Sequence, residues 1–199
     1  MIQDILNITN IHPKRLINIY GFGSQIYGNA SKNSDKDFIV IAKSSITEKE
    51  FKSDLYNIHL LSEDKFLLGL KNHNIRDLEC IYAPNWAKLV INKEFDFEIN
   101  KPSLRHSISH SNSNSWVKCK KKLAQGDYYI GVKSLFHSMR IANFGIQLVN
   151  ENKISDFTSC NWIWDEIKSK QWTWEELDAR WKPYNNEIMH EFRIKCSKK

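Results

Sequence analysis

The segment spanning residues 16–42 limits the fold of this 199-residue chain more than any other part of the sequence. Residues 16–20, an apolar run with two isoleucines, lead into Gly21-Phe22-Gly23, which predicts a strand that ends in a tight turn. Residues 24–27 are expected to begin a helix, with Ser24 near its cap. A second apolar run, residues 37–42, predicts a strand in the centre of a sheet.

Two carboxylates precede and begin the second strand. Because Asp35 and Asp37 are two positions apart on extended backbone, their side chains are expected on one face. Mg²⁺ is the natural partner of such a pair, since it prefers oxygen ligands and binds through one or two carboxylates plus substrate phosphates. The turn at Gly23-Ser24 can offer backbone N–H groups and a hydroxyl to a phosphate. Each part is common alone, but together they predict a site for a magnesium-bound nucleoside triphosphate.

The combined pattern resembles a known superfamily. Gly23-Ser24 followed 11 positions later by Asp35-x-Asp37 resembles the signature of the polymerase-beta-type nucleotidyltransferases. The flanking Tyr27-Gly28 and Ser34 resemble the predicted branch associated with RNA repair. The resemblance is strongest over residues 17–82. It implies ATP or another nucleoside triphosphate as substrate and two Mg²⁺ ions as cofactors, with Mn²⁺ as a possible substitute.

The superfamily usually carries a third carboxylate on a later strand. Residues 77–82, closed by Pro84, are predicted to form such a strand, and by geometry either Asp77 or Glu79 could serve. The resemblance favours Glu79, so we expect Asp35, Asp37 and Glu79 to be the catalytic and metal-binding residues. The alternative is that Glu79 is an ordinary charge on the surface of a strand.

The remaining pattern predicts an α+β chain with two domains. Helices are expected over residues 47–55, where Thr47-x-x-Glu50 fits a capping box, and from residue 62, with a strand at 56–61 between them. A serine-rich segment, residues 103–115, is interpreted as the boundary between a nucleotidyltransferase domain (1–102), with a mixed sheet and flanking helices, and a small helical domain (103–199) for substrate or nucleotide binding. In that second domain, helices are expected at 116–123, 129–149 and 162–168, and from 173, where a second capping box lies.

The second domain also contributes candidate phosphate contacts. Lys133, His137 and Arg140 fall on one helical face at i, i+4 and i+7. In the superfamily a residue of the helical domain often binds the triphosphate, so the resemblance implies nucleotide binding by Lys133, Arg140 and His137, beside Gly23 and Ser24. The alternatives are a solvated cationic stripe and, for His137, a packed polar residue.

Charge and composition set the range of partners. Residues 1–100 hold 12 Lys/Arg and 13 Asp/Glu, a net of −1, whereas residues 101–199 hold 17 and 10, a net of +7. A basic second half suits an anionic substrate, and the lysines at 118 and 120–122 either contact nucleic-acid phosphates or form a solvated face. His106 and His110 lack a third metal ligand nearby, so a metal site is not predicted there.

The spacing of the tryptophans predicts that they pack in a helical core. No membrane span or secretory signal is expected, which favours a cytoplasmic setting with a nuclear one still open.

These features predict Mg²⁺-dependent transfer of a nucleoside monophosphate from a nucleoside triphosphate to an acceptor hydroxyl. An RNA or tRNA 3′ end is the first candidate acceptor. A small molecule or a protein side chain is the second. A third hypothesis is a non-catalytic, antitoxin-like module with the same fold. The sequence leaves open the base preference, templating and the oligomeric state.

Overall fold

The computed structural model describes residues 1–32 and 34–197 and divides the chain into two compact units, Met1–Glu98 and Ile99–Lys199. Within the described residues, no helix has the combination of length and apolar content that crossing a membrane requires.

The first unit is built on a mixed five-stranded sheet. Its order is β3-β4-β2-β1-β5, so β2 lies in the middle, as its apolar sequence predicted. The β2 and β4 strands are parallel, while the pairs β1–β2, β1–β5 and β3–β4 are antiparallel. The strands are β1 (Leu16–Phe22), β2 (Lys36–Ala42), β3 (Glu48–Lys52), β4 (Tyr56–Ser62) and β5 (Lys88–Ile91).

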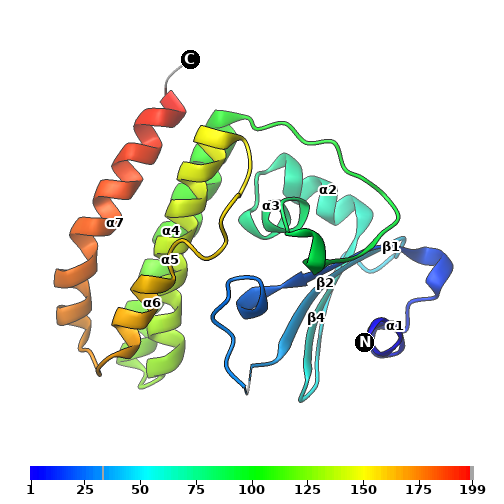
Figure 1. Ribbon diagram of the computed structural model, residues 1–199, viewed down its shortest axis with the longest axis horizontal. Helices are drawn as coiled ribbons and strands as arrows, with labels where there is room; N and C mark the ends of the chain where they lie inside the picture. The colour runs from blue at the N-terminus through cyan, green and yellow to red at the C-terminus, as the bar shows by residue number, and fades with distance from the viewer. Residues whose placement is uncertain (33, 198–199) are drawn as a thin grey trace. The chain divides into compact units, whose positions relative to one another are not determined.

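Helices of the first unit cover both faces of this sheet. On one face, Ile5 of α1 (Ile2–Thr9) packs in a core cluster with Ile19 and Val40. On the other face, the Phe66 ring of α2 (Glu63–Lys71) stacks on the Tyr20 ring at 6.3 Å between centroids. Figure 1 shows α2 beside α3 (Ile75–Ile81). Three short 3₁₀ turns, Pro13–Arg15, Gly23–Gln25 and Asn85–Ala87, complete the unit.

The helix predicted over residues 47–55 is wrong, because this segment forms the edge strand β3. Phe51 is opposite Ile58 in the antiparallel ladder with β4, and the neighbouring charged side chains stay exposed. Glu50 forms an ion pair with Lys52 at 3.1 Å. The capping-box pattern was therefore overridden by strand pairing, which a local propensity does not detect.

The strand predicted over residues 77–82 is also wrong: the segment belongs to α3, and the next strand is β5, which the sequence reading missed. The α3 helix is buried on several sides, and two of its buried residues are carboxylates. The helical spacing of its apolar residues Ile75 and Leu78 was therefore not evident in the sequence. The helix expected from Ser24 to Tyr27 is reduced to the 3₁₀ turn Gly23–Gln25, whose cap residue is Phe22 and which has no side-chain cap.

The second unit is helical, and Figure 1 shows its three long helices running alongside one another. The serine-rich residues 103–115 lie inside the first of these helices and do not form a linker. The mixed sheet with flanking helices, followed by helices only, confirms the predicted fold class. The helices are α4 (Lys101–Ala124), α5 (Tyr128–Glu151), α6 (Asn161–Lys168) and α7 (Trp174–Ser197).

Tryptophans of the second unit pack mainly in its core, as their spacing predicted. Trp181 is fully buried, and Trp164 lies 5.3 Å from the Phe136 ring centroid. A buried polar contact joins the three long helices, since Asn112 Nδ2 donates to Asn185 Oδ1 at 2.8 Å and to the Ser138 backbone oxygen at 2.9 Å. Satisfied polar groups of this kind fix how helices pair in a core.

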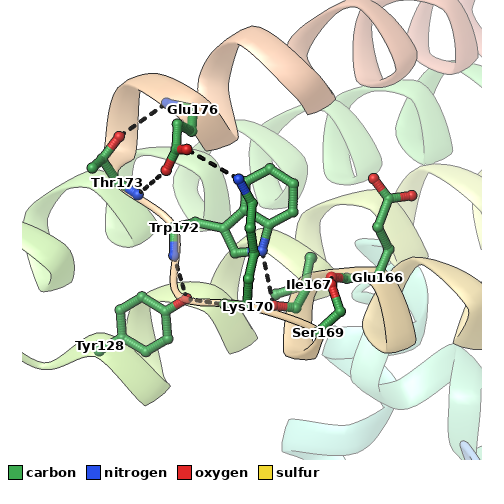
Figure 2. Close-up of polar contacts among 8 residues, drawn as sticks. All are labelled: Tyr128, Glu166, Ile167, Ser169, Lys170, Trp172, Thr173 and Glu176. Atoms are coloured by element: carbon green, nitrogen blue, oxygen red, sulfur yellow. Dashed lines mark hydrogen bonds and ion pairs between the residues drawn. The ribbon is translucent and has the colours of Figure 1, made fainter.

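The capping box predicted at Thr173 is confirmed, and Figure 2 shows both of its hydrogen bonds. The Glu176 backbone N–H donates to Thr173 Oγ1 at 3.2 Å, and the Thr173 N–H donates to Glu176 Oε2 at 2.8 Å. The preceding residue is anchored too, because Trp172 Nε1 donates to the Ile167 carbonyl at 3.0 Å. The start of α7 is therefore determined by its local sequence.

Replacing Thr173 with alanine should lower the free energy of unfolding by about 1 kcal/mol, because the substitution removes the side-chain acceptor for an N–H of the first helical turn. Urea unfolding followed by circular dichroism measures the change. Thr173→Ser, which keeps the hydroxyl, is the matched control and should stay close to wild type. Equal losses in the two variants would show that the methyl group, and not the cap, is responsible.

Candidate active site

The Gly-Ser turn directly follows β1 and lies against the start of β2. Phe22, the last residue of β1, is paired with Asp37 in the antiparallel ladder. The chain then turns at Gly23, whose φ of 70° is in the left-handed region. Its carbonyl accepts hydrogen bonds from the N–H groups of Ile26 at 3.0 Å and Tyr27 at 3.2 Å. A left-handed residue in a tight turn favours glycine, so the sequence determines this geometry locally.

Asp37 packs directly on this glycine. A Cβ atom built on Gly23 would overlap the Asp37 carboxylate, with Oδ2 as the nearest atom. The other carboxylate oxygen, Oδ1, accepts a hydrogen bond from Asn57 Nδ2 at 3.0 Å. Asn57 is the partner of Asp37 in the parallel β2–β4 ladder. The half-buried carboxylate is therefore held between the turn and the adjacent strand.

Asp35 immediately precedes β2 and is exposed. Alternation along extended backbone predicts that its side chain shares a face with Asp37. Asp37 itself shares the face of Ile39, which is paired with Tyr20 and so lies beneath α2. Both predicted carboxylates therefore lie at the beginning of the central strand, and Asp37 packs on the Gly23 turn.

This arrangement fits a magnesium ion in its donor chemistry. Two carboxylates on one face offer hard oxygen ligands, and Mg²⁺ needs only one or two from the protein. Beside them, Asn57 Oδ1 is a buried acceptor without a hydrogen-bond partner in the described part of the chain. Such an acceptor suits an ion that keeps its waters, because those waters donate hydrogen bonds. Among residues 1–32 and 34–197, no three His, Cys, Asp or Glu side chains cluster as a metal site, so Asp35, Asp37 and Glu79 do not form such a group.

Glu79 lies on α3, not on a strand, and is almost fully buried at 1% exposure. Its Oε2 accepts a hydrogen bond from the Tyr27 hydroxyl. Since Tyr27 belongs to the loop after the Gly-Ser turn, and its N–H donates to the Gly23 carbonyl, this contact ties α3 to the turn. In the structure, Glu79 therefore supports the Gly23–Gln25 turn, and its role as a metal ligand stays a prediction.

Asp77, the alternative third carboxylate, makes buried contacts that stabilise the first unit. It is fully buried, and Arg76 Nε donates to its Oδ1 at 2.9 Å. The same arginine reaches Glu48 of β3 at 2.6 Å. Burial raises the pKa of Asp77, while the neighbouring guanidinium opposes that shift. Asp77 also packs against Gly69 of α2, where a Cβ atom would overlap its carboxylate. These contacts hold α2, α3 and β3 together.

The three α5 candidates differ strongly in their environments. Lys133 is exposed, with Nζ 5.7 Å from the Tyr129 ring centroid, whereas Arg140 is only 6% exposed. Arg140 Nη2 lies 2.6 Å from His137 Nδ1. Burial, followed by the positive charges of Arg140 and nearby lysines, holds the pKa of His137 well below its usual range. His137 is therefore neutral at pH 7 and accepts at Nδ1, so it adds no positive charge there. Nucleotide binding by all three stays a prediction.

Two contributors were missed as site residues. Asn57 orients Asp37 through the register of a parallel ladder, which no local pattern reveals. Tyr27 belongs to the sequence motif, but only the structure reveals that its hydroxyl connects the turn to Glu79. An aromatic hydroxyl four residues after a turn glycine is a weak signal, and its partner is 52 positions away in the sequence.

No family model matches the chain, and no curated protein matches it either. Among solved structures, it is similar to a spectinomycin adenyltransferase from Enterococcus faecialis crystallised with ATP and spectinomycin, at 14% identity and a TM-score of 0.49, covering 99% of this chain and 98% of that one. It is also similar to a nucleotidyltransferase-like protein from Exiguobacterium sibiricum, at 13% identity and a TM-score of 0.34, covering 97% and 73%. Both similar structures are thus described as nucleotidyltransferases or as like them, and similarity at this level assigns no activity to the present chain.

Proposed function

We propose that this protein is a nucleotidyltransferase of the polymerase-beta type, which transfers a nucleoside monophosphate from a magnesium-bound nucleoside triphosphate to an acceptor hydroxyl. The observation that carries the proposal is the packing of the Asp37 carboxylate directly on the left-handed Gly23 turn. A phosphate-binding turn in contact with a metal-binding carboxylate is what a bound metal–triphosphate requires.

Each residue has a defined part in this proposal. Asp35 and Asp37 hold the metal, and Asn57 keeps the Asp37 carboxylate oriented. The backbone of Gly23 and the hydroxyl of Ser24 contact the β- and γ-phosphates. Glu79, through Tyr27, keeps the turn in place. Catalysis then rests on alignment and on neutralising the negative charge of the phosphates, not on a covalent intermediate.

A bound metal ion would supply a lower pKa for the attacking hydroxyl and positive charge beside the pyrophosphate leaving group. Two Mg²⁺ ions are proposed, with Mn²⁺ as a possible substitute. Asp35 and Asp37 are the proposed carboxylate ligands, and Glu79, whose Oε2 accepts from the Tyr27 hydroxyl, stays the predicted third one. Lys133 is exposed on α5 and is the candidate for an additional phosphate contact from the helical unit.

The proposed acceptor is an RNA 3′ end. Support comes from the charge of the second half of the chain, a net of +7 over residues 101–199 from 17 basic and 10 acidic residues. A polyanionic acceptor gains more from such a surface than a small neutral molecule does.

The test is pyrophosphate release with Mg²⁺ and each nucleoside triphosphate in turn. One set of reactions contains pooled RNA, and a second contains small hydroxyl compounds, with spectinomycin among them. We expect release in the RNA set from wild type and none from Asp35→Ala/Asp37→Ala. Release only with a small molecule would replace the RNA acceptor. Equal background release by wild type and variant in every reaction would overturn the enzymatic function and favour a non-catalytic module.

A further inference from the structure

The helical unit carries a shallow groove that the proposed catalytic residues do not use. It has a volume of about 550 Å³ and lies between the first half of α4 and the end of α7. The α4 lining residues recur at helical spacing and so share one face. The groove is lined by Arg105, His106, Ser109, His110 and Ser113 from α4 and by Arg193 from α7.

This groove has no acidic lining residue, and its arginines are not neutralised. Among residues 1–32 and 34–197, neither Arg105 nor Arg193 has an ion-pair partner. Arg105 Nη1 donates only to the uncharged Ser197 hydroxyl, at 3.0 Å. By contrast, Arg180 on the same helix as Arg193 is matched by Glu166, with two hydrogen bonds of 2.7 and 2.9 Å.

A second group of positive charges lies further along α4. No Asp or Glu stands between Glu98 and Asp127, and this 24-residue helix contains six lysines and arginines. Residues 106–117 contain no Lys or Arg, and Lys121 follows His110 by 11 residues, three helical turns, so it lies on the same face as the groove. From Arg105 to Lys121 the helix rises about 24 Å at about 1.5 Å per residue. A single small anion does not reach both groups, whereas a chain of phosphates does.

The lining chemistry also matches a phosphodiester chain. Guanidinium groups bind phosphate oxygens through paired hydrogen bonds, and serine hydroxyls are common phosphate partners in nucleic-acid complexes. The rings of His106 and His110 are stacked at 6.1 Å between centroids with an interplanar angle of 9°, as neighbours one helical turn apart. His110 Nε2 is within hydrogen-bonding distance of Asn114 Nδ2, at 2.8 Å.

We propose that this α4–α7 groove binds the phosphate backbone of single-stranded RNA, with Arg105 and Arg193 as the principal contacts. The choice of RNA rests on the proposed function, because RNA is the acceptor named there. The binding itself requires no nucleotide, no metal and no intact Asp35–Asp37 pair, so a failure of catalysis and a failure of this groove are distinguishable.

The experiment measures binding of a short fluorescent single-stranded RNA to the full chain by polarisation, without nucleoside triphosphate, as salt rises from about 50 to about 200 mM. The test variant is Arg105→Glu/Arg193→Glu. The matched control is Lys14→Glu/Lys153→Glu, which changes the net charge equally at two exposed lysines, one in each unit. Arg105→Gln/Arg193→Gln is a second test variant in case charge reversal disturbs folding, and circular dichroism checks all three.

We expect the arginine reversal to weaken RNA binding at least about tenfold and to reduce the salt slope by about 1.4, the value for two lost phosphate contacts on a single strand. The lysine control should lose much less. Equal losses in the two double variants, or no RNA binding by wild type at the lowest salt, would overturn the proposal. It would also be overturned if polyglutamate or inorganic phosphate displaced the RNA as well as unlabelled RNA does at equal total charge.

Discussion

Replacing Asp37 with asparagine should reduce nucleotidyl transfer by at least about 10²-fold and leave the free energy of unfolding within about 0.5 kcal/mol of wild type. The two side chains have nearly the same shape, so asparagine fits the space beside Gly23. Its Oδ1 still accepts the hydrogen bond from Asn57 Nδ2. What the substitution removes is the negative charge that, in the proposed mechanism, holds the metal. A steady-state pyrophosphate assay and urea unfolding of the same preparation separate activity from stability.

Asp54→Asn is the control for Asp37→Asn. Asp54 is an exposed carboxylate between β3 and β4, and its substitution makes the same change in charge and shape. This control should retain wild-type activity. If Asp37→Asn also retained it, Asp37 would have no part in catalysis. If the variant unfolded much more easily, its loss of activity would reflect folding and not metal binding.

Gly23→Ala should strongly reduce nucleotidyl transfer, because the added methyl group has no room beside Asp37. Gly23 has a φ of 70°. In that conformation any residue with a Cβ atom destabilises the folded protein by about 1–2 kcal/mol. In addition, the new methyl group would overlap the Asp37 carboxylate, so that carboxylate or the turn must shift. Because a displacement of about 1 Å at a reacting centre can cost about 10²-fold in rate, we expect transfer to fall by that factor or more.

Gly126→Ala separates the backbone cost of a left-handed alanine from the overlap with the Asp37 carboxylate. Gly126 also has a left-handed backbone, with a φ of 78°, but a Cβ atom there meets no other atom within 4 Å. This variant should show the backbone cost of about 1–2 kcal/mol in urea unfolding and keep its activity. Equal effects of the two substitutions on unfolding and on transfer would mean that contact with Asp37 is unimportant. A larger loss of transfer for Gly23→Ala would assign the difference to that contact.

Several features that depend on neighbouring residues were predicted correctly from the sequence. The strands β1, β2 and β4 follow from their apolar composition, and α2 begins where Ser62 accepts a hydrogen bond from the Lys65 N–H. The capping box at Thr173 formed as expected. Each of these signals acts within a few residues along the chain, so a linear pattern contains the information.

Features that depend on distant partners were not predicted. Thr47-x-x-Glu50 fits a helix-start pattern, yet residues 48–52 form a strand because they pair with β4, a contact that the local pattern does not contain. Glu79 and Asp77 suggested one face of a strand, but α3 buries both, one against Tyr27 and the other against Arg76. Propensity differences of up to about 1 kcal/mol are small beside the free energy of burying a strand or helix face, so tertiary packing decided these elements.

The sequence by itself determined the pair Asp35 and Asp37, their common face and the turn at Gly23, because two-residue alternation and a left-handed glycine are local properties of the backbone. The tertiary structure alone decided that Asp37 lies on Gly23, that Asn57 orients it and that Glu79 is bound to Tyr27. It also decided that Arg105 and Arg193, 88 positions apart in the sequence, line one groove. These contacts join segments that are distant in the chain, and only the packing of whole strands and helices brings them together.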